Sequence, residues 1–304
     1  MNIEKVNYQG WPSCYRISNG EVEAIVTGDI GPRVMRYGFV GSRNFFKEFA
    51  DQMGKSGEPA WQPRGGHRVW IAPEDRVSSY APDNQPVSIA VHADGVEATG
   101  PVEPLTGLEK QILLKMSSSG TRVEVIHRIR NAGAQPYVLA PWILTMMAQG
   151  GVGIHGFPPR GTHPEDLAPA NPLVMWAFTD LSDARWRLLE KYLVLRQDPA
   201  NPRPQKLGSF HRHTWGAYVL HDELFVKRTD AVAEPASYPD MGCSFEMFTN
   251  ADILELETLG PLVKLDPGAV VTHTEWWSAH RGVYVAEWTD AELDRVVRPL
   301  VEVS

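Results

Sequence analysis

The sequence predicts an all-β protein: a large sandwich of antiparallel sheets with few short helices, one of them at the C-terminus. Two observations support this fold class. Short runs of alternating apolar and polar residues recur along the chain, and each run ends at turn residues. The 26 Gly and 24 Pro lie mostly between these runs. Because 43% of the 304 residues are hydrophobic, the chain has enough apolar residues for one large core. We therefore expect a single domain over residues 1–304.

The expected strands follow one another with short separations. Residues 109–116 and 121–133 flank the sequence SSSG and predict a hairpin. The other strand-like runs are residues 21–28, 32–41, 86–95, 215–220, 224–228, 243–249, 251–258 and 270–279. This even spacing is typical of a β-sandwich.

Helical signals are few. Residues 183–194 predict one short helix. A second is expected over residues 289–302, where Thr289 or Asp290 can cap the first turn and Pro299 limits the regularity. The Pro-rich stretch 153–175 predicts a long ordered loop, and loops of this length are often functional.

Composition excludes several classes of function. The net charge of −8 and the pI of about 5.7 argue against nucleic acid or an anionic membrane as a partner. Cys14 and Cys243 are too far apart to suggest a disulfide framework or a metal motif. The N-terminal residues lack the apolar core of a signal peptide, and no apolar run approaches the length of a membrane span. We expect a soluble, cytoplasmic protein.

The first candidate site is the stretch 64–86, which is rich in Gly, Pro and polar residues of different kinds. Gly65 and Gly66 permit a tight backbone just before His67. A sugar site needs donors, acceptors and an aromatic platform, and this stretch supplies all of them: His67, Arg68, Trp70, Glu74, Tyr80, Asp83 and Asn84. The alternative is a solvated loop with a capped turn.

The second candidate is a pair of acids in an apolar strand. Glu255 and Glu257 in ILELETLGPL share one face of the expected strand, while Leu254 and Leu256 take the other. The pair could line a cleft and exchange protons. The alternative is an edge strand whose acidic face lies in water.

Histidines and nucleophiles give weaker signals. His211 and His213 could share a strand face, but no third ligand follows from their spacing, so we expect no metal site and no cofactor. We expect His127, His273 and His280 to be structural or on strand surfaces. Signatures of Ser or Cys nucleophiles are absent from the sequence.

Further charged residues could line the same cleft or pair on the surface. Asp240 and Glu246 lie in SYPDMGCSFEMFTN, and Lys206 and Lys227 flank the preceding hairpin. Arg33, Arg68 and Lys227 could serve an anionic substituent on a sugar.

Five segments in this order resemble the galactose mutarotase-like superfamily: GDIGPRVMRYGFVGSRNFF, GGHRVWIAPED, YAPDNQPV, RNAGAQPYVLAPWILTMM and YPDMGCSFEMFTNADILELETLGPLVKLDPGAVVTHTEWW. The resemblance covers about residues 20–285. It implies a β-supersandwich with a carbohydrate cleft on a concave face, and the activity of an aldose 1-epimerase, which needs no metal.

In that superfamily a glutamate removes the anomeric proton and a histidine protonates the ring oxygen. The resemblance places the base at Glu257 through LET, or at Glu255 through E-x-x-T. Trp142 stands where the superfamily has its acid histidine, so the acid role could pass to His67 or be lost. The implied substrate-binding residues are Arg33, Arg68, Trp70, Glu74, Trp142, Asp240 and Lys227.

Three functions follow from these observations. The first is an aldose 1-epimerase acting through Glu257 or Glu255 with His67. The second is a non-catalytic sugar-binding protein with Trp70 and Trp142 as stacking platforms. The third is a hydrolase or lyase that pairs one of the two glutamates with Glu74 or Asp240 as second acid. All three bind a sugar or sugar derivative.

Overall fold

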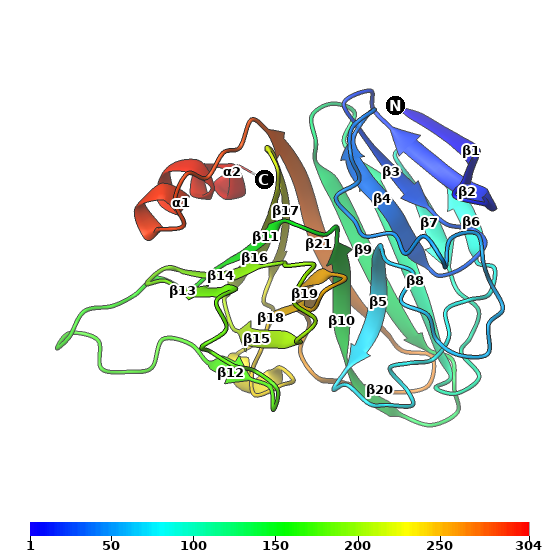
Figure 1. The fold of residues 1–304 in the computed structure, drawn as a ribbon. Helices are drawn as coiled ribbons and strands as arrows, with labels where there is room; N and C mark the ends of the chain where they lie inside the picture. The colour runs from blue at the N-terminus through cyan, green and yellow to red at the C-terminus, as the bar shows by residue number, and fades with distance from the viewer. Residues whose placement is uncertain (304) are drawn as a thin grey trace. The chain divides into compact units, whose positions relative to one another are not determined.

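The computed structural model describes residues 1–303 and divides into two compact units (Figure 1). Unit 1 comprises Met1–Met146 and Leu262–Trp277, and unit 2 comprises Met147–Pro261 and Ser278–Ser304. Both units are built from antiparallel strands, which confirms the all-β prediction. The single-domain expectation stays a prediction.

Unit 1 contains two sheets. The first has the order β1-β2-β3-β4-β5-β10, with β20 also paired to β10, and the second has the order β21-β9-β8-β7-β6. The strands are β1 (Asn2–Tyr8), β2 (Trp11–Ser18), β3 (Val22–Val26), β4 (Arg33–Phe39), β5 (His67–Ala72), β6 (Ser88–Val91), β7 (Gly95–Thr99), β8 (Leu108–Met116), β9 (Val123–Asn131), β10 (Tyr137–Met147), β20 (Val263–Leu265) and β21 (Val270–Arg281), the last of which ends in unit 2.

Unit 2 also contains two sheets, in the orders β19-β18-β15-β12 and β13-β14-β11-β16-β17. The strands are β11 (Val152–Gly156), β12 (Leu173–Met175), β13 (Trp186–Leu188), β14 (Tyr192–Arg196), β15 (Gln205–Ser209), β16 (His213–Leu220), β17 (Glu223–Asp230), β18 (Phe245–Thr249) and β19 (Leu254–Leu259). A short 3-10 helix covers Pro235–Ser237.

The hairpin expected around SSSG is confirmed. β8 and β9 pair over their whole length, from Leu108 opposite Asn131 to Met116 opposite Val123. On β9 buried and half-buried residues alternate strictly, because one face packs inside and the other does not.

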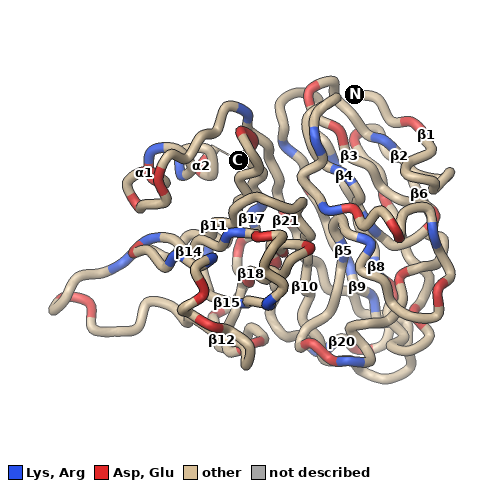
Figure 2. Tube along the Cα trace, viewed as in Figure 1, with Lys and Arg blue, Asp and Glu red and all other residues tan. Residues whose placement is uncertain are grey.

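The C-terminal helix is confirmed, but it is broken in two. α1 (Asp290–Val296) begins at Thr289, whose side chain accepts a hydrogen bond from the Glu292 amide. α2 (Arg298–Glu302) carries Pro299 in its first turn, where a missing amide proton costs little. Acidic and basic residues are mixed along both helices (Figure 2), and their apolar residues pack on strands β11, β14, β16 and β17. Among residues 1–303, no helix is long and apolar enough to cross a membrane.

The helix expected over residues 183–194 is wrong. This segment forms β13 and the start of β14, which pair with Trp186 opposite Leu195 and Leu188 opposite Leu193. β14 also pairs with β11, and four of its five residues are buried. Tertiary burial between two strands therefore overrides the local helical preference.

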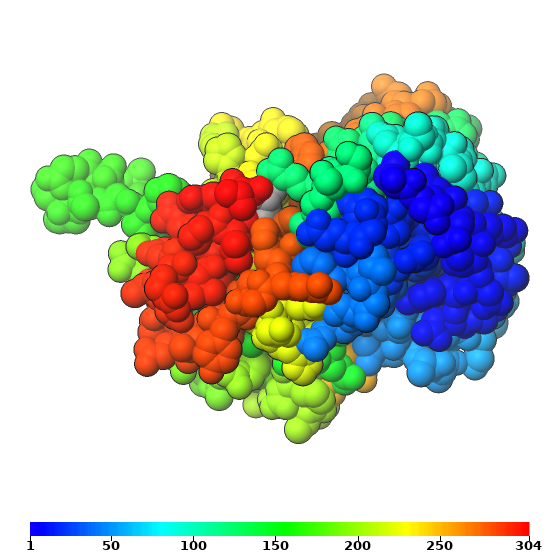
Figure 3. Space-filling model, turned by 90° about the horizontal axis from the view of Figure 1, so that it is seen from above, coloured from blue at the N-terminus to red at the C-terminus, as the bar shows by residue number. Residues whose placement is uncertain are grey.

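The Pro-rich stretch is only in part a loop. Its first residues belong to β11 and its last to β12, and residues 159–170 between them are exposed. Figure 3 shows this green segment projecting from the rest of unit 2.

His155 on β11 is a fully buried titratable group in unit 2. Its Nδ1 donates to the Trp215 carbonyl over 2.7 Å, its Nε2 lies 2.6 Å from Ser209 Oγ, and its ring stacks on Phe245 with centroids 4.3 Å apart. Burial lowers the pKa of His155 to about 3. The imidazole is therefore neutral at physiological pH.

We predict that His155 destabilises the protein progressively below pH 6.5. Between the ordinary pKa of 6.5 and the folded-state pKa of about 3, the unfolded chain binds a proton that the folded chain excludes, so stability falls as pH falls. From pH 6.5 to about pH 5 the loss is about 2 kcal/mol. Urea unfolding of wild type and His155→Gln at both pH values measures it. The wild type should lose about 2 kcal/mol more than the variant, and equal losses would contradict the prediction.

Candidate functional site

A buried ammonium group between two buried carboxylates is the main polar feature of unit 2. Lys206 Nζ lies 2.6 Å from Glu246 Oε2 and 2.8 Å from Glu257 Oε2. Glu246 and Glu257 face each other directly across β18 and β19, and Lys206 comes from β15 on the other side of β18. Both glutamate side chains are 0% exposed and the lysine side chain is 6% exposed. We call these three residues the carboxylate cluster.

The cluster holds more negative than positive charge if both acids are ionised. Burial raises the pKa of Glu246 well above its usual value; Lys206 opposes this shift, and Glu257 reinforces it by repulsion. Burial alone would lower the pKa of Lys206, but the two glutamates outweigh it and raise that pKa. A proton on Glu246 leaves Lys206 and Glu257 as a neutral pair, which is the cheapest arrangement in a buried place.

Glu246 Oε2 pairs with Lys206, whereas Glu246 Oε1 is buried without a hydrogen-bond partner within residues 1–303, so Oε1 is the position at which the proton can sit. Beside the cluster, the Trp176 ring lies 4.7 Å from Lys206 Nζ. Glu255 shares the Glu257 face of β19 and is 7% exposed. The arrangement thus offers a proton donor, an acceptor and an aromatic ring together.

The sequence predicts for Glu246 and Lys206 only that they line the cleft or pair on the surface. The acidic pair in LELET is the sharper prediction, because two acids in an apolar strand are unusual. The partner that Glu257 meets is instead a cross-strand neighbour 11 positions earlier, and only the strand register reveals it. The same register places Glu255 opposite Phe248.

The stretch 64–86 begins with a buried strand rather than a loop. Gly65 and Gly66 adopt φ of +96° and +73°, and a Cβ at Gly65 would collide with the Lys47 carbonyl oxygen. This confirms the tight backbone expected before His67. β5 then places Arg68 and Trp70 on one face and His67 on the other.

Arg68 and Trp70 belong to an aromatic cluster in unit 1. The Arg68 guanidinium lies 4.4 Å from the Trp70 ring and 5.0 Å from the Trp61 ring, as in cation–π pairs. Trp142 lies opposite Trp70 on β10, with centroids 5.4 Å apart, and Tyr80 meets Trp70 edge-on at 5.0 Å. Trp70 and Trp142 are almost fully buried, whereas Tyr80 is 36% exposed.

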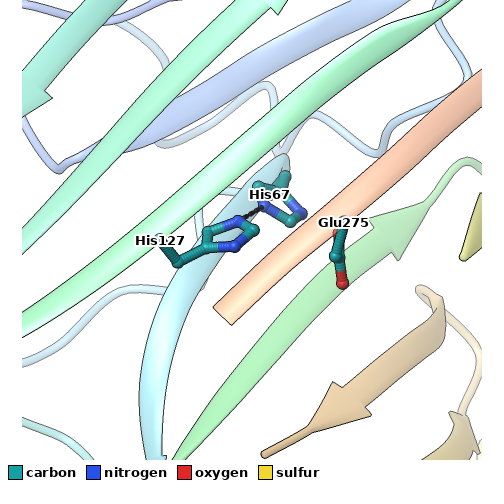
Figure 4. A group of neighbouring side chains, drawn as sticks. All are labelled: His67, His127 and Glu275. Atoms are coloured by element: carbon teal, nitrogen blue, oxygen red, sulfur yellow. Dashed lines mark hydrogen bonds between the residues drawn. The ribbon is translucent and has the colours of Figure 1, made fainter. Parts of the chain in front are cut away.

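His67 lies in a hydrogen-bonded chain inside unit 1. His67 Nε2 and His127 Nε2 are 2.7 Å apart (Figure 4). His67 Nδ1 is 2.9 Å from Thr145 Oγ1, and His127 Nδ1 is 2.8 Å from the His273 carbonyl oxygen. A carbonyl oxygen only accepts, so His127 carries its proton on Nδ1. A hydrogen bond between the two Nε2 atoms then requires one further proton, carried by one of the two rings. Both nitrogens of His67 and both nitrogens of His127 are engaged in this chain.

One group of described residues could hold a metal ion: His67, His127 and Glu275, whose donor atoms lie within 4.8 Å of one another. Sequence reasoning missed this group because its members come from β5, β9 and β21. The two imidazole nitrogens lie at the distance of an N–H···N hydrogen bond, so the hydrogen-bonded chain already accounts for their approach. The expectation of no metal site stays a prediction.

Arg33 and Lys227, two further residues expected to bind the substrate, are held by buried contacts. Arg33 is fully buried, donates to the Pro63 and Gly65 carbonyls and pairs with Asp83 over 2.5 Å. Burial alone would raise the pKa of Asp83, but Arg33 outweighs burial and holds that pKa below its usual value. Lys227 is also fully buried, with its ammonium on the Leu256 carbonyl at 3.1 Å. These contacts hold both side chains inside the protein, and the expected part of Arg33 and Lys227 in sugar binding stays a prediction.

Glu74 and Asp240 lie outside the carboxylate cluster. Glu74 is exposed and accepts a hydrogen bond from Tyr80. Asp240 has a φ of +52° in the turn before β18, and its carbonyl accepts from Cys243. His211 and His213 lie with ring centroids 6.3 Å apart, and His213 bonds Asp230. The structure therefore brings together some expected residues in each unit, and the meeting of the β5 residues with the β19 glutamates stays a prediction.

Comparison with known proteins shows which solved structures have a similar fold. No protein-family model and no curated protein matches the sequence. Three solved structures align with a TM-score of 0.57 each. The Slr1438 protein of Synechocystis sp. PCC 6803 is 11% identical and aligns over 91% of this chain and 99% of its own. A galactose mutarotase-like protein of Lactobacillus casei is 8% identical, over 88% and 100%. A proposed aldose 1-epimerase of Klebsiella pneumoniae is 12% identical, over 99% and 86%. The chain thus has the fold of the galactose mutarotase-like proteins.

Proposed function

We propose that the protein binds an aldose, or an aldose derivative, at the carboxylate cluster and interconverts its anomers. The observation that carries this proposal is the pair Glu246 and Glu257, bridged by Lys206, in which burial raises the pKa of Glu246. Two carboxyl groups with different proton affinities are the acid and the base that anomer exchange requires. The fold shared with a proposed aldose 1-epimerase supports the choice of sugar.

The reaction follows from these roles. Glu257 takes the proton of the anomeric hydroxyl, and Glu246 gives its proton to the ring oxygen. The bond between C1 and the ring oxygen breaks, leaving an open chain with a carbonyl at C1. Rotation about the C1–C2 bond presents the other face of the carbonyl. The hydroxyl formed from the ring oxygen attacks C1 as Glu246 takes back its proton, and Glu257 returns its proton to the carbonyl oxygen. Lys206 stays charged throughout and stabilises whichever carboxylate is ionised.

The acid in this proposal is Glu246 and not His67. Both ring nitrogens of His67 are bonded within unit 1, and the side chain is 0% exposed. A general acid must reach the substrate oxygen with the proton that it gives. Glu246 is equally buried, but its Oε1 has no hydrogen-bond partner among residues 1–303, whereas both ring nitrogens of His67 have one.

A non-catalytic sugar-binding protein is the second candidate. The observation that favours it is the complete burial of both cluster glutamates, which places the acid and base beneath the surface. Polarimetry of freshly dissolved aldoses separates the two candidates. Faster equilibration than in buffer supports the epimerase, whereas a sugar-dependent rise in Tm without any change in rate supports the binding protein. The cytoplasmic location and the absence of nucleic-acid partners also stay predictions.

We predict that Glu257→Gln lowers kcat by about 10²–10⁴-fold, the usual contribution of a positioned general base. Gln keeps the size and can still meet Lys206, but it cannot take a proton. The loss should fall on kcat and leave sugar affinity nearly unchanged, because proton transfer belongs to the transition state. Polarimetric rates and sugar-induced Tm shifts measure the two effects. Glu255→Gln is the matched control on the same strand face, and an equal loss in both variants would contradict the assignment of Glu257.

We predict that Glu246→Gln also lowers kcat and changes its pH profile. In the wild type the rate should fall as pH rises through the raised pKa of Glu246, because the acid form disappears. Gln does not titrate, so the variant should lack this alkaline decline and show only a low residual rate. Measuring kcat of the wild type and of Glu246→Gln across the pH range tests this prediction. An unchanged alkaline decline in Glu246→Gln would assign the acid to another residue.

We predict that His67→Asn lowers stability but leaves turnover per folded molecule within about twofold. The substitution breaks the chain from Thr145 to His127 and leaves buried polar groups without partners, at a cost of about 1–3 kcal/mol. Urea unfolding gives the stability change, and polarimetry normalised to folded protein gives the rate. A loss of rate as large as that of Glu257→Gln, with stability retained, would restore His67 as the acid.

A further inference from the structure

The Trp176 side chain lies over the carboxylate cluster. Trp176 directly follows β12, and Met175 at the end of this strand lies opposite Leu207 on β15. The next position therefore brings Trp176 beside Lys206, on the same face of the sheet. The indole is half-buried, and its ring lies 4.7 Å from Lys206 Nζ. The ring thus fills the space next to the ammonium, which a sugar would enter to reach both carboxylates.

Gly208 makes room for the indole in this position. Gly208 on β15 lies opposite Glu246 on β18. A Cβ at Gly208 would come within 3.2 Å of the Trp176 ring and within 2.5 Å of Cys243 Sγ. Any larger side chain would push the ring away or displace its neighbours. The absence of a side chain at Gly208 therefore lets the indole rest directly beside the buried carboxyl group.

The backbone of Trp176 is anchored, but its indole is not. The Trp176 amide donates to Thr179 Oγ1 over 2.9 Å, and the Thr179 hydroxyl donates to the Lys206 carbonyl. Among residues 1–303, no group forms a hydrogen bond with the indole Nε1 of Trp176. By contrast, Trp186 Nε1 donates to Gln205 Oε1 over 3.0 Å, and Trp186 is almost fully buried. The contact with the ammonium is thus the polar interaction that holds the Trp176 ring.

The ring can leave the ammonium without unfolding a strand. One cation–π contact favours the closed position over an open one by about 2–30-fold. β12 is a strand of three residues at the edge of its sheet, paired with β15 on one side. A ring that rotates outward from this edge meets water instead of a neighbouring strand. An open minority state of the side chain is therefore accessible.

We propose that the Trp176 indole is a lid over the carboxylate cluster, and that it rotates away from Lys206 when a sugar enters. In the closed position the ring covers the ammonium, and in the open position a sugar hydroxyl takes the place of the ring. This inference rests on the proposed function, because it assumes that the cluster is the sugar site. It also explains how Glu246 and Glu257 can be completely buried in a protein that acts on a sugar.

The lid is first tested without any sugar. A water-soluble carbodiimide with glycinamide converts accessible carboxyl groups to amides, and peptide mass spectrometry gives the rate at each site. Trp176→Ala should label Glu246 about 3–30-fold faster than the wild type, because the cluster is then always uncovered. Glu234, whose side chain is 70% exposed, is the internal control and should react equally in both proteins. Equal labelling of Glu246 in the two proteins would overturn the lid.

A matched variant separates the lid from general loosening of this edge. Phe178 lies in the same turn, is 42% exposed, and meets Phe248 with ring centroids 6.4 Å apart. Phe178→Ala should label Glu246 at the wild-type rate, and a rise as large as that of Trp176→Ala would contradict the proposal. Trp176→Thr, which suits an edge strand, gives the same test if the alanine variant does not fold.

Polarimetry then tests the lid during turnover. Trp176→Ala should lower KM by about 3–30-fold and leave kcat per folded molecule within about twofold, because sugar binding no longer includes the cost of opening. Loss of a merely structural residue would raise KM or lower kcat. Trp176→Phe keeps a ring over the ammonium and should restore the wild-type KM, and Phe178→Ala should leave KM unchanged.

The two experiments distinguish failure of the lid from failure of the proposed function. If the wild type does not interconvert aldoses but Trp176→Ala exposes Glu246 to the carbodiimide, the epimerase is wrong and the lid over the cluster is retained. If the wild type is active but KM is unchanged or raised in Trp176→Ala, the epimerase is retained and the lid is wrong.

Discussion

The structure of the candidate site depends on the ammonium group of Lys206, which lies between two carboxylates at a place that water does not reach. Removing three charges from water is expensive, and mutual attraction repays that cost only when the geometry is close and the net charge is small. The distances of 2.6 Å and 2.8 Å meet the first condition. A proton on Glu246 keeps the net charge small. The burial that makes ionised groups costly therefore also raises the pKa of this carboxyl group.

Unit 1 solves the problem of buried polar groups differently. Two of its imidazoles are joined in one hydrogen-bonded chain, from the Thr145 hydroxyl through His67 and His127 to a backbone carbonyl. Its buried arginines use carbonyls, an aspartate or aromatic faces. Polar residues that look alike in the sequence therefore divide into two groups. Those of unit 1 contact hydroxyl, carbonyl and aromatic groups, whereas the carboxylate cluster places two acids on one ammonium group and so raises the pKa of Glu246 by burial and repulsion.

The fold class could be predicted from the sequence because alternation and turn residues act over a few positions. The hairpin at SSSG and the capped C-terminal helix are of this local kind. The segment 183–194 could not be predicted in the same way, since it forms β13 and the start of β14, and β14 gains its second neighbour β11 only after folding. The site shows the same limit. Glu257 stood out in its own strand, but its partners Glu246 and Lys206 are fixed by register, and the pairing of His67 with His127 joins residues 60 positions apart.

The direct opposition of Glu246 and Glu257 has a consequence for how the chain finds its fold. Side chains on a strand alternate between faces, so a slip of β19 by one residue against β18 would exchange the faces of its glutamates and leucines. Glu257 would then leave Lys206 and enter the apolar interior as an unpaired charge, while Leu256 would replace it beside the ammonium. Few mispaired states are so costly. The residues proposed for chemistry thus also select one alignment of these strands from among the alternatives that hydrophobic burial alone would leave close in energy.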